Sequence, residues 1–112
     1  LDPSIKHACA ALDGWDERLL QWIIDSGVSA IASDNLAVEV IKRPIPDCHC
    51  GTSLPLHDLC LFKLGVHLGE LWHLADLSEW LTANGRNRFF LTAPPLRLTG
   101  AVGSPLTPIA TV

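Results

Sequence analysis

The sequence predicts a mixed α/β fold, because helix-like segments and short apolar runs follow one another along the chain. The first helix-like segment ends at Gly27, a common position for glycine, and the apolar run 28–32 follows it directly. The second ends at Gly65 and leads into the run 66–72. Since the run 28–32 does not alternate with polar residues, we expect a strand that is buried on both faces.

Caps, prolines and glycines set the remaining element bounds. We expect Asp13 to cap a helix whose apolar face includes Trp15 and Ile23. Residues 42–55 carry three prolines and one glycine, which is typical of a loop. Further helices are expected at 56–64 and 75–83, and further strands or extended segments at 66–72, 88–93, 96–99 and 106–112.

Composition limits the class of protein. The 112 residues are enough for one domain, and 48% hydrophobic with 18% charged residues argues against disorder. The net charge is −4 and the eight Lys and Arg are scattered singly, which argues against a nucleic-acid or anionic membrane surface. No apolar run approaches the roughly 20 residues of a membrane span. Without a secretory signal the four cysteines are expected to be reduced, so we expect a cytoplasmic protein. The absence of Met and the apolar excess indicate part of a larger polypeptide.

The most informative pair of residues is His57 and Glu70. Alternation in the strand 66–72 places Glu70 on the same face as Val66, Leu68 and Trp72, and an unpaired carboxylate on an apolar face is costly. A neutral imidazole and a carboxylate are ligands for a divalent metal, and a helix followed by a returning strand can bring the two together. The alternative is a core histidine that bonds to a backbone group, which spacing alone favours. Two ligands are also fewer than the three protein ligands of catalytic zinc sites, so others must come from elsewhere.

Two further segments carry candidate residues. Asp34 and Asn35 follow the expected strand 28–32, where ligands commonly bind in α/β folds, although the sequence alone favours a plain turn. Cys48-His49-Cys50 has the residue types of a zinc site. It lacks the usual spacing and a second pair, so we interpret it as a loop with unpaired thiols.

Two long runs of the chain resemble a known family. The segments LPLHDLCLFKLGVHLGELW, residues 54–72, and FFLTAPPLRLTGAVGSPLTPIA, residues 89–110, resemble the cyclase family of metal-dependent hydrolases. That family includes kynurenine formamidase (arylformamidase) and isatin hydrolase. Its N-terminal motif, H-x-G-T-H-x-D-x-P-x-H, does not occur in this chain. The resemblance therefore implies that residues 1–112 are a single partial domain, the C-terminal half of a swivelling β/β/α fold.

The resemblance also implies a site and a reaction. His57 and Glu70 fall on the family's two later metal-ligand positions, which implies zinc or manganese as cofactor. Asp34 and Asn35 would line the pocket, and Trp72 would stack on an aromatic substrate, with a core role as the alternative for this Trp. The implied reaction is attack of a metal-activated water on the amide, lactam or lactone carbonyl of a small molecule, as in the arylformamidase step of tryptophan catabolism.

Three readings of the whole chain stay open. The first is part of a hydrolase that is inactive without its N-terminal half and that forms a homo-oligomer when intact. The second is a non-catalytic binding or assembly module that retains the cyclase scaffold. The third is an independent enzyme whose ligands are shared across a homo-oligomer.

Overall fold

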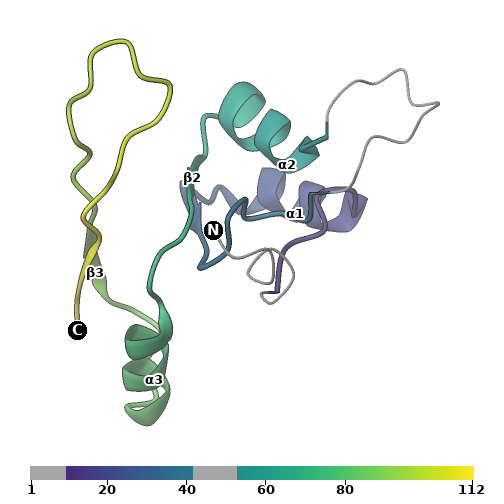
Figure 1. The fold of residues 1–112 in the computed structure, drawn as a ribbon. Coiled ribbons are helices and arrows are strands. Elements are labelled where there is room, and N and C mark those ends of the chain that lie inside the picture. Colours follow the sequence, from purple (N-terminus) through teal and green to yellow (C-terminus); the bar gives the residue numbers. More distant parts are fainter. Residues whose placement is uncertain (1–9, 42–52) are drawn as a thin grey trace. The chain divides into compact units, whose positions relative to one another are not determined.

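The computed structural model describes residues 10–41 and 53–112 (Figure 1). The chain divides into two compact units, Leu1–Trp72 and His73–Val112. The segment that holds Cys48, His49 and Cys50 lies outside the described residues, as does Cys9.

The first unit is built around a parallel strand pair. Helix α1, Glu17–Ser26, precedes strand β1, Ala30–Ala32, and a helical segment precedes strand β2, His67–Gly69. This segment begins as α2, Pro55–His57, and continues as the π-helix η2, Asp58–Leu64. In the parallel pair, Ala30 lies opposite His67 and Ala32 lies opposite Gly69. The helix–strand order that the sequence predicted is confirmed here, although part of the second helix has the wider π geometry.

The start of α1 differs from the prediction. Asp16 is the N-cap, and its side chain accepts a hydrogen bond from the backbone N–H of Arg18 at 2.9 Å. Asp13 instead accepts from the backbone N–H of Trp15 at 3.0 Å, which makes a separate turn before the helix. The predicted end is confirmed, because Gly27 ends the helix with φ +66°, a conformation that favours glycine.

Both strands of the pair are shorter than expected. Ala30 and Ala32 are exposed and Ile31 is half-buried, so the prediction of a strand buried on both faces is wrong for the part of the chain that the structure describes. Within these residues β1 pairs only with β2. The regular part of β2 ends at Gly69, because Leu71 has φ +57° and turns the chain. Contact with the first segment nevertheless continues, since the Trp72 N–H donates to the Ser33 carbonyl at 3.0 Å.

A small apolar core joins the elements of the first unit. Its buried members come from α1, from the segment after β1, from α2 and η2, and from the residue before β2: Ile23, Val38, Leu56, Cys60 and Val66. Burial of these side chains is the main stabilising contribution in this unit. The core holds the carboxyl end of β1, the start of α2 and the carboxyl end of β2 close together.

The second unit is a helix followed by a hairpin. Helix α3, Ala75–Ala83, has the predicted bounds. Strand β3, Phe90–Thr92, pairs antiparallel with β4, Ile109–Thr111. The predicted strand 96–99 is absent from the hairpin, where Pro95 forms a single bridge with Leu106. Proline lacks the N–H that a longer ladder would need.

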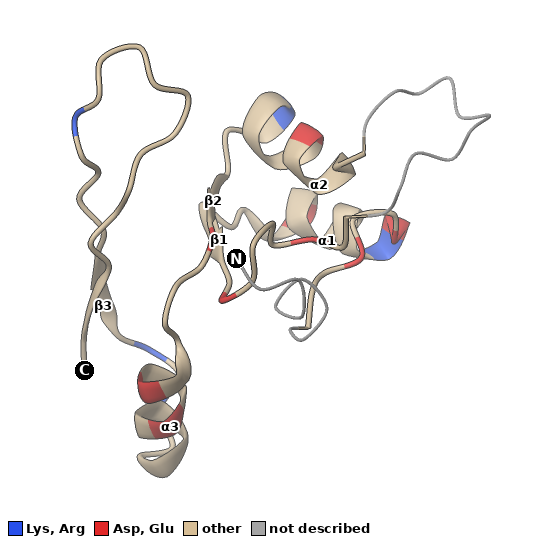
Figure 2. Cartoon of the chain, in the orientation of Figure 1, with Lys and Arg blue, Asp and Glu red and all other residues tan. Residues whose placement is uncertain are grey.

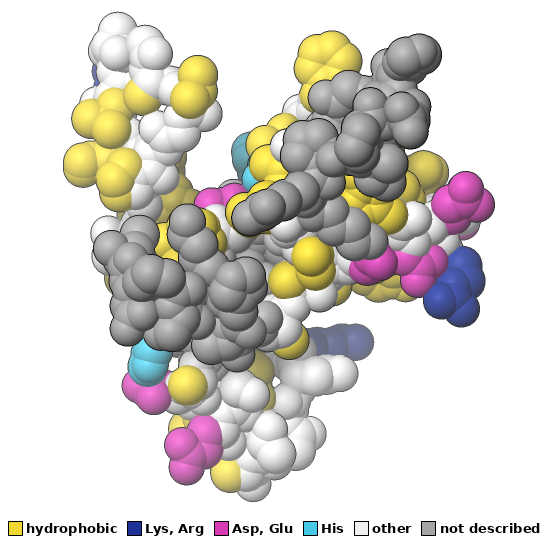
Figure 3. All heavy atoms as spheres, turned by 45° about the vertical axis from the view of Figure 1, so that its right-hand side comes forward, with side chains coloured by type: hydrophobic (Ala, Val, Ile, Leu, Met, Phe, Trp, Pro, Cys, Tyr) yellow, Lys and Arg dark blue, Asp and Glu magenta, His cyan; other side chains and the backbone are white. Residues whose placement is uncertain are grey.

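The surface of the described residues is apolar in places and carries few cations. Large hydrophobic side chains reach the surface (Figure 3), among them Trp22, Leu61 and Phe62. The Lys and Arg positions are scattered along the described ribbon (Figure 2). In the described ranges, every helix is too short or too polar to cross a membrane.

Candidate metal centre

Near the carboxyl end of the parallel strand pair, a histidine lies between two carboxylates. His57, the last residue of α2, places Nδ1 2.8 Å from Oε1 of Glu39 and Nε2 3.2 Å from Oε1 of Glu70. Glu70 directly follows β2, and Glu39 belongs to the segment after β1. The predicted meeting of His57 with Glu70 is therefore present, and a second acid takes part.

The two carboxylates differ strongly in burial. The Glu70 side chain is 36% exposed, whereas that of Glu39 is 0% exposed. The sequence predicts that Glu70 is the acid on an apolar face and that it needs a compensating partner. The buried acid of the site is instead Glu39. The cost of desolvating its charge must be offset by hydrogen bonds.

Three N–H groups supply these bonds to Glu39. Its Oε2 accepts from the backbone N–H of Leu56 at 3.0 Å, and its Oε1 accepts from the backbone N–H of His57 at 2.9 Å. The third contact is Nδ1 of His57, 2.8 Å from Oε1, and an ionised carboxylate at this position requires Nδ1 to be the donor. The two backbone groups lie in the first turn of α2, where amides lack partners within the helix. Glu39 therefore closes the start of α2 and holds the imidazole at the same time.

The bonding fixes which nitrogen of His57 is free for a ligand. An ionised carboxylate only accepts hydrogen bonds, so Nδ1 carries a proton toward Glu39. Nε2 then faces Glu70 either with a second proton, as imidazolium, or with a lone pair. In the second case a nitrogen lone pair and a carboxylate oxygen converge, which is the donor set that zinc and other divalent metals accept.

These residues therefore fit part of a metal site. A histidine that donates its other N–H to a carboxylate is the usual arrangement of a metal-bound imidazole. With ligand bonds of about 2.0–2.2 Å, two atoms 3.2 Å apart can reach one ion. In the ranges that the structure describes, however, no group of three or more His, Cys, Asp or Glu is placed to hold a metal. Further ligands would have to come from elsewhere.

Two strained backbone positions adjoin the carboxylates. Val38, which precedes Glu39, has φ +58°, and Leu71, which follows Glu70, has φ +57°. A β-branched residue such as valine rarely adopts this left-handed conformation. Strained residues of this kind concentrate at functional sites, which is consistent with a functional role for this corner of the molecule.

The other predicted site residues lie at the same end of the strand pair. Asp34 is exposed. Asn35 is buried, and its amide accepts from the Ser33 hydroxyl at 2.7 Å and donates to the Ala10 carbonyl at 3.0 Å. Trp72 is half-buried beside Gly69, where an added Cβ would lie within 3.0 Å of the indole ring. The role of these three residues toward a substrate stays a prediction.

Glu39 is the site residue that sequence analysis missed. A signal was available, because Glu39 stands alone among the apolar residues of the run LAVEV, residues 36–40. Glu70 is likewise a single acid among apolar neighbours, and this pattern is the reason that the sequence singles it out.

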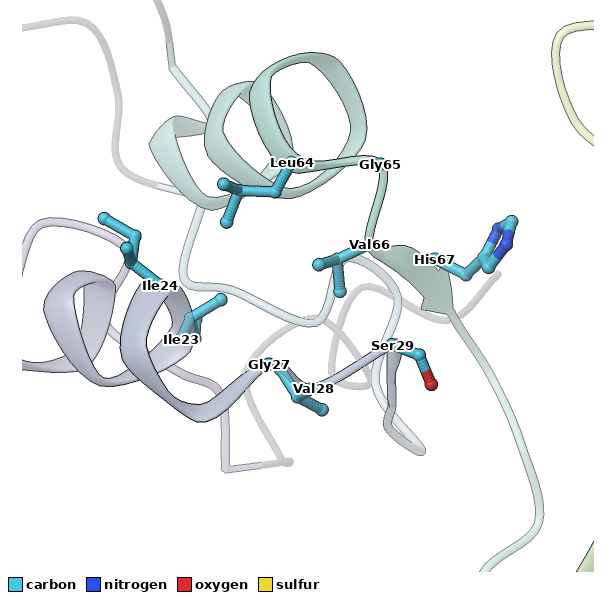
Figure 4. Close-up of a pocket in the computed structure, with 9 residues that line it drawn as sticks. All are labelled: Ile23, Ile24, Gly27, Val28, Ser29, Leu64, Gly65, Val66 and His67. Carbon is cyan, nitrogen blue, oxygen red and sulfur yellow. The ribbon is translucent and has the colours of Figure 1, made fainter.

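An apolar groove of about 400 Å³ lies at the opposite ends of the strands. In Figure 4, Ile23 of α1 and Val66 point toward one another across it, whereas the His67 side chain points away. The groove contains no acid and lies apart from His57. We therefore do not assign it to the metal centre.

Comparison with known proteins supports the cyclase family. No family model matches the chain, and no curated protein matches it. A solved structure described as a novel cyclase matches with 40% identity and a TM-score of 0.68 over 83% of this chain. The chain spans 28% of the length of that protein. The likeness supports a cyclase-like fold of mixed helices and strands.

Proposed function

We propose that this chain is the C-terminal part of a metal-dependent hydrolase of the cyclase family. The observation that carries the proposal is the convergence of His57 Nε2 and Glu70 Oε1 at 3.2 Å, with Nδ1 of the same ring bound to a buried carboxylate. The likeness to a cyclase over 83% of the chain supports it independently. Because the chain spans 28% of that protein, the remaining ligands would come from the rest of the polypeptide.

Each residue of this chain has a distinct task in the proposed site. His57 would contribute a neutral nitrogen to the metal, and Glu70 an oxygen with a negative charge. When bound, zinc or manganese would supply an activated water and polarise the scissile carbonyl. Asp34 and Asn35 would lie along the pocket, and the exposed part of the Trp72 ring would offer a flat surface to an aromatic substrate. The substrate class is a small amide, lactam or lactone, as for an arylformamidase or isatin hydrolase.

Three related expectations belong to this proposal. The fold would be the C-terminal portion of a swivelling β/β/α arrangement, and the intact protein would form a homo-oligomer. A cytoplasmic location is consistent with the free, buried thiol of Cys60. The reading frame that encodes this chain should also encode H-x-G-T-H-x-D upstream, and its absence would argue strongly against the proposal.

A second candidate is a non-catalytic module that retains the scaffold. The observation that favours it is the absence, among the described residues, of a third ligand beside His57 and Glu70. In this candidate an imidazolium would bridge Glu39 and Glu70, and the three residues would serve only stability.

Metal analysis separates the two candidates. We would measure bound zinc and manganese in the full-length protein and in Glu70→Gln, with Glu79→Gln on the exposed surface of α3 as the matched control. The hydrolase predicts metal in wild type and control and little in Glu70→Gln. Hydrolysis of N-formylkynurenine and isatin by the same samples tests the substrate class. A full-length protein that binds neither metal supports the module.

A further inference from the structure

We infer that Glu39 is a positioning residue, which holds the His57 ring with Nδ1 as donor so that the lone pair of Nε2 faces Glu70. The inference rests on the proposed metal site and adds to it a residue that would not touch the metal. It concerns the tautomer and orientation of one ring, which are measurable without turnover.

The hydrogen-bond pattern allows a single orientation of the ring. Oε1 of Glu39 accepts from both the backbone N–H and the Nδ1 of His57, at 2.9 and 2.8 Å. Turning the ring would leave this buried oxygen with one partner fewer and would place a carbon against it. Because the backbone and side chain of one residue bind one oxygen, the ring is fixed relative to its own helix.

The Glu39 carboxylate is fully buried and lies directly against Gly14. An added Cβ on the buried Gly14 would overlap Oε2 of Glu39, so the absence of a side chain at Gly14 is what admits the carboxylate. On the other side, Val38 is fully buried and holds φ +58°, which sets the direction in which Glu39 leaves the chain. A close glycine and a strained valine are both costly for the fold, which argues that this placement serves a purpose beyond packing.

A purely structural explanation also exists. Glu39 could serve only to bind the two free amides at the start of α2, those of Leu56 and His57. This cap would need no contact with the ring. The two explanations differ in what happens at Nδ1 and Nε2 of His57 when the carboxylate changes.

Glu39→Gln distinguishes the two explanations. A Gln side chain has one oxygen and one NH₂ where Glu39 has two oxygens. With the NH₂ toward Leu56, two donors meet. With the NH₂ toward His57, it opposes the backbone N–H of that residue, which Oε1 of Glu39 accepts in wild type, and Nδ1 can bond to it only by accepting. The ring proton then moves to Nε2 and removes the lone pair that faces Glu70. Gly14→Ala is the second variant, because it displaces the carboxylate without altering any charge.

The measurements are ¹⁵N NMR of histidine-labelled, metal-free, full-length protein and titration with Zn²⁺ alone. His57→Asn assigns the His57 signals, and Glu79→Gln is the matched control. We expect Nδ1 protonated and Nε2 unprotonated in wild type, a shift toward the opposite tautomer in Glu39→Gln or Gly14→Ala, and a roughly 10- to 100-fold loss of Zn²⁺ affinity.

Two results would overturn the inference. One is a wild-type His57 with the proton on Nε2, which can be seen even if neither variant folds. The other is a folded Gly14→Ala protein that keeps both the wild-type tautomer and the wild-type Zn²⁺ affinity. Failure of wild type to bind Zn²⁺ would instead count against the proposed function, and the tautomer measurement would still decide the role of Glu39.

Discussion

Asn35 gives the sharpest test of whether a predicted site residue serves the substrate or the fold. Its side chain is 9% exposed. The Nδ2 group donates to the carbonyls of Ala10 at 3.0 Å and Val38 at 3.3 Å, and Oδ1 accepts from the Ser33 hydroxyl at 2.7 Å. The amide thus ties the segment before α1 to the turn after β1.

The contacts predict an order of stability among variants. Asn35→Ala removes three hydrogen bonds, but the Val38 carbonyl keeps the N–H of Leu12 as a donor at 3.0 Å. Ala10 is exposed and Ser33 is half-buried, so water can replace the partners that they lose. At about 0.5–1.5 kcal/mol net for each of the three hydrogen bonds, the loss should be about 1.5–4.5 kcal/mol. Asn35→Asp has nearly the same shape, yet it would set a buried negative charge against two carbonyl oxygens. We expect it to cost more than Asn35→Ala, in the range of about 3–5 kcal/mol.

Urea denaturation followed by tryptophan fluorescence measures these differences. Asp34→Asn is the matched control, because this neighbouring side chain is exposed and its change should cost less than about 0.5 kcal/mol. An Asn35→Asp protein as stable as wild type would refute the assigned hydrogen bonds. A higher KM with unchanged stability in Asn35→Ala would support the substrate role instead.

Three other perturbations probe separate contacts. Hydrogen bonds from the Arg18 side chain, and then from its backbone N–H, lower the pKa of the Asp16 carboxyl. Asp16→Ala should therefore destabilise α1 at neutral pH. The difference should disappear as pH falls through the folded-state pKa, which denaturation at several pH values would show. Burial, and then the charge of Glu39, raises the pKa of the Cys60 thiol. In a variant with the other cysteines replaced by serine, alkylation of Cys60 should therefore stay slow until denaturant is added. Gly69→Ala should displace the Trp72 ring, seen as a red shift of its fluorescence.

The helix ends could be predicted from sequence because they depend on local signals, whereas the His57–Glu70 pair was selected mainly by the resemblance to the cyclase family. Gly27 and Gly65 end their helices in the left-handed conformation, as expected. The returning strand brings His57 to Glu70 because the turn at Gly65 is tight. A glycine that ends a helix lies within a few residues of the helix whose end it determines.

The strands and Glu39 depend on contacts between distant segments. The run 28–32 is apolar enough for a buried strand, but burial requires neighbours, and among the described residues β1 has only β2. Glu39 bonds to His57, which lies 18 positions later in the chain. No periodicity reports such a contact. The left-handed conformation of Leu71 could not be predicted either, because this position holds neither glycine nor asparagine, the residues that favour it.

The geometry around His57 also bears on how tightly the proposed metal site would bind its ion. A ligand on a free side chain must lose its rotational freedom when metal binds, and that loss weakens binding. Here the ring is already fixed by a buried carboxylate, and its helix is closed by the same group. Glu70 is different: it is partly exposed and follows a short strand, so its orientation is less constrained. If the proposed function holds, we expect His57 to provide the fixed reference of the site, with Glu70 and the ligands from the rest of the protein adjusting around it.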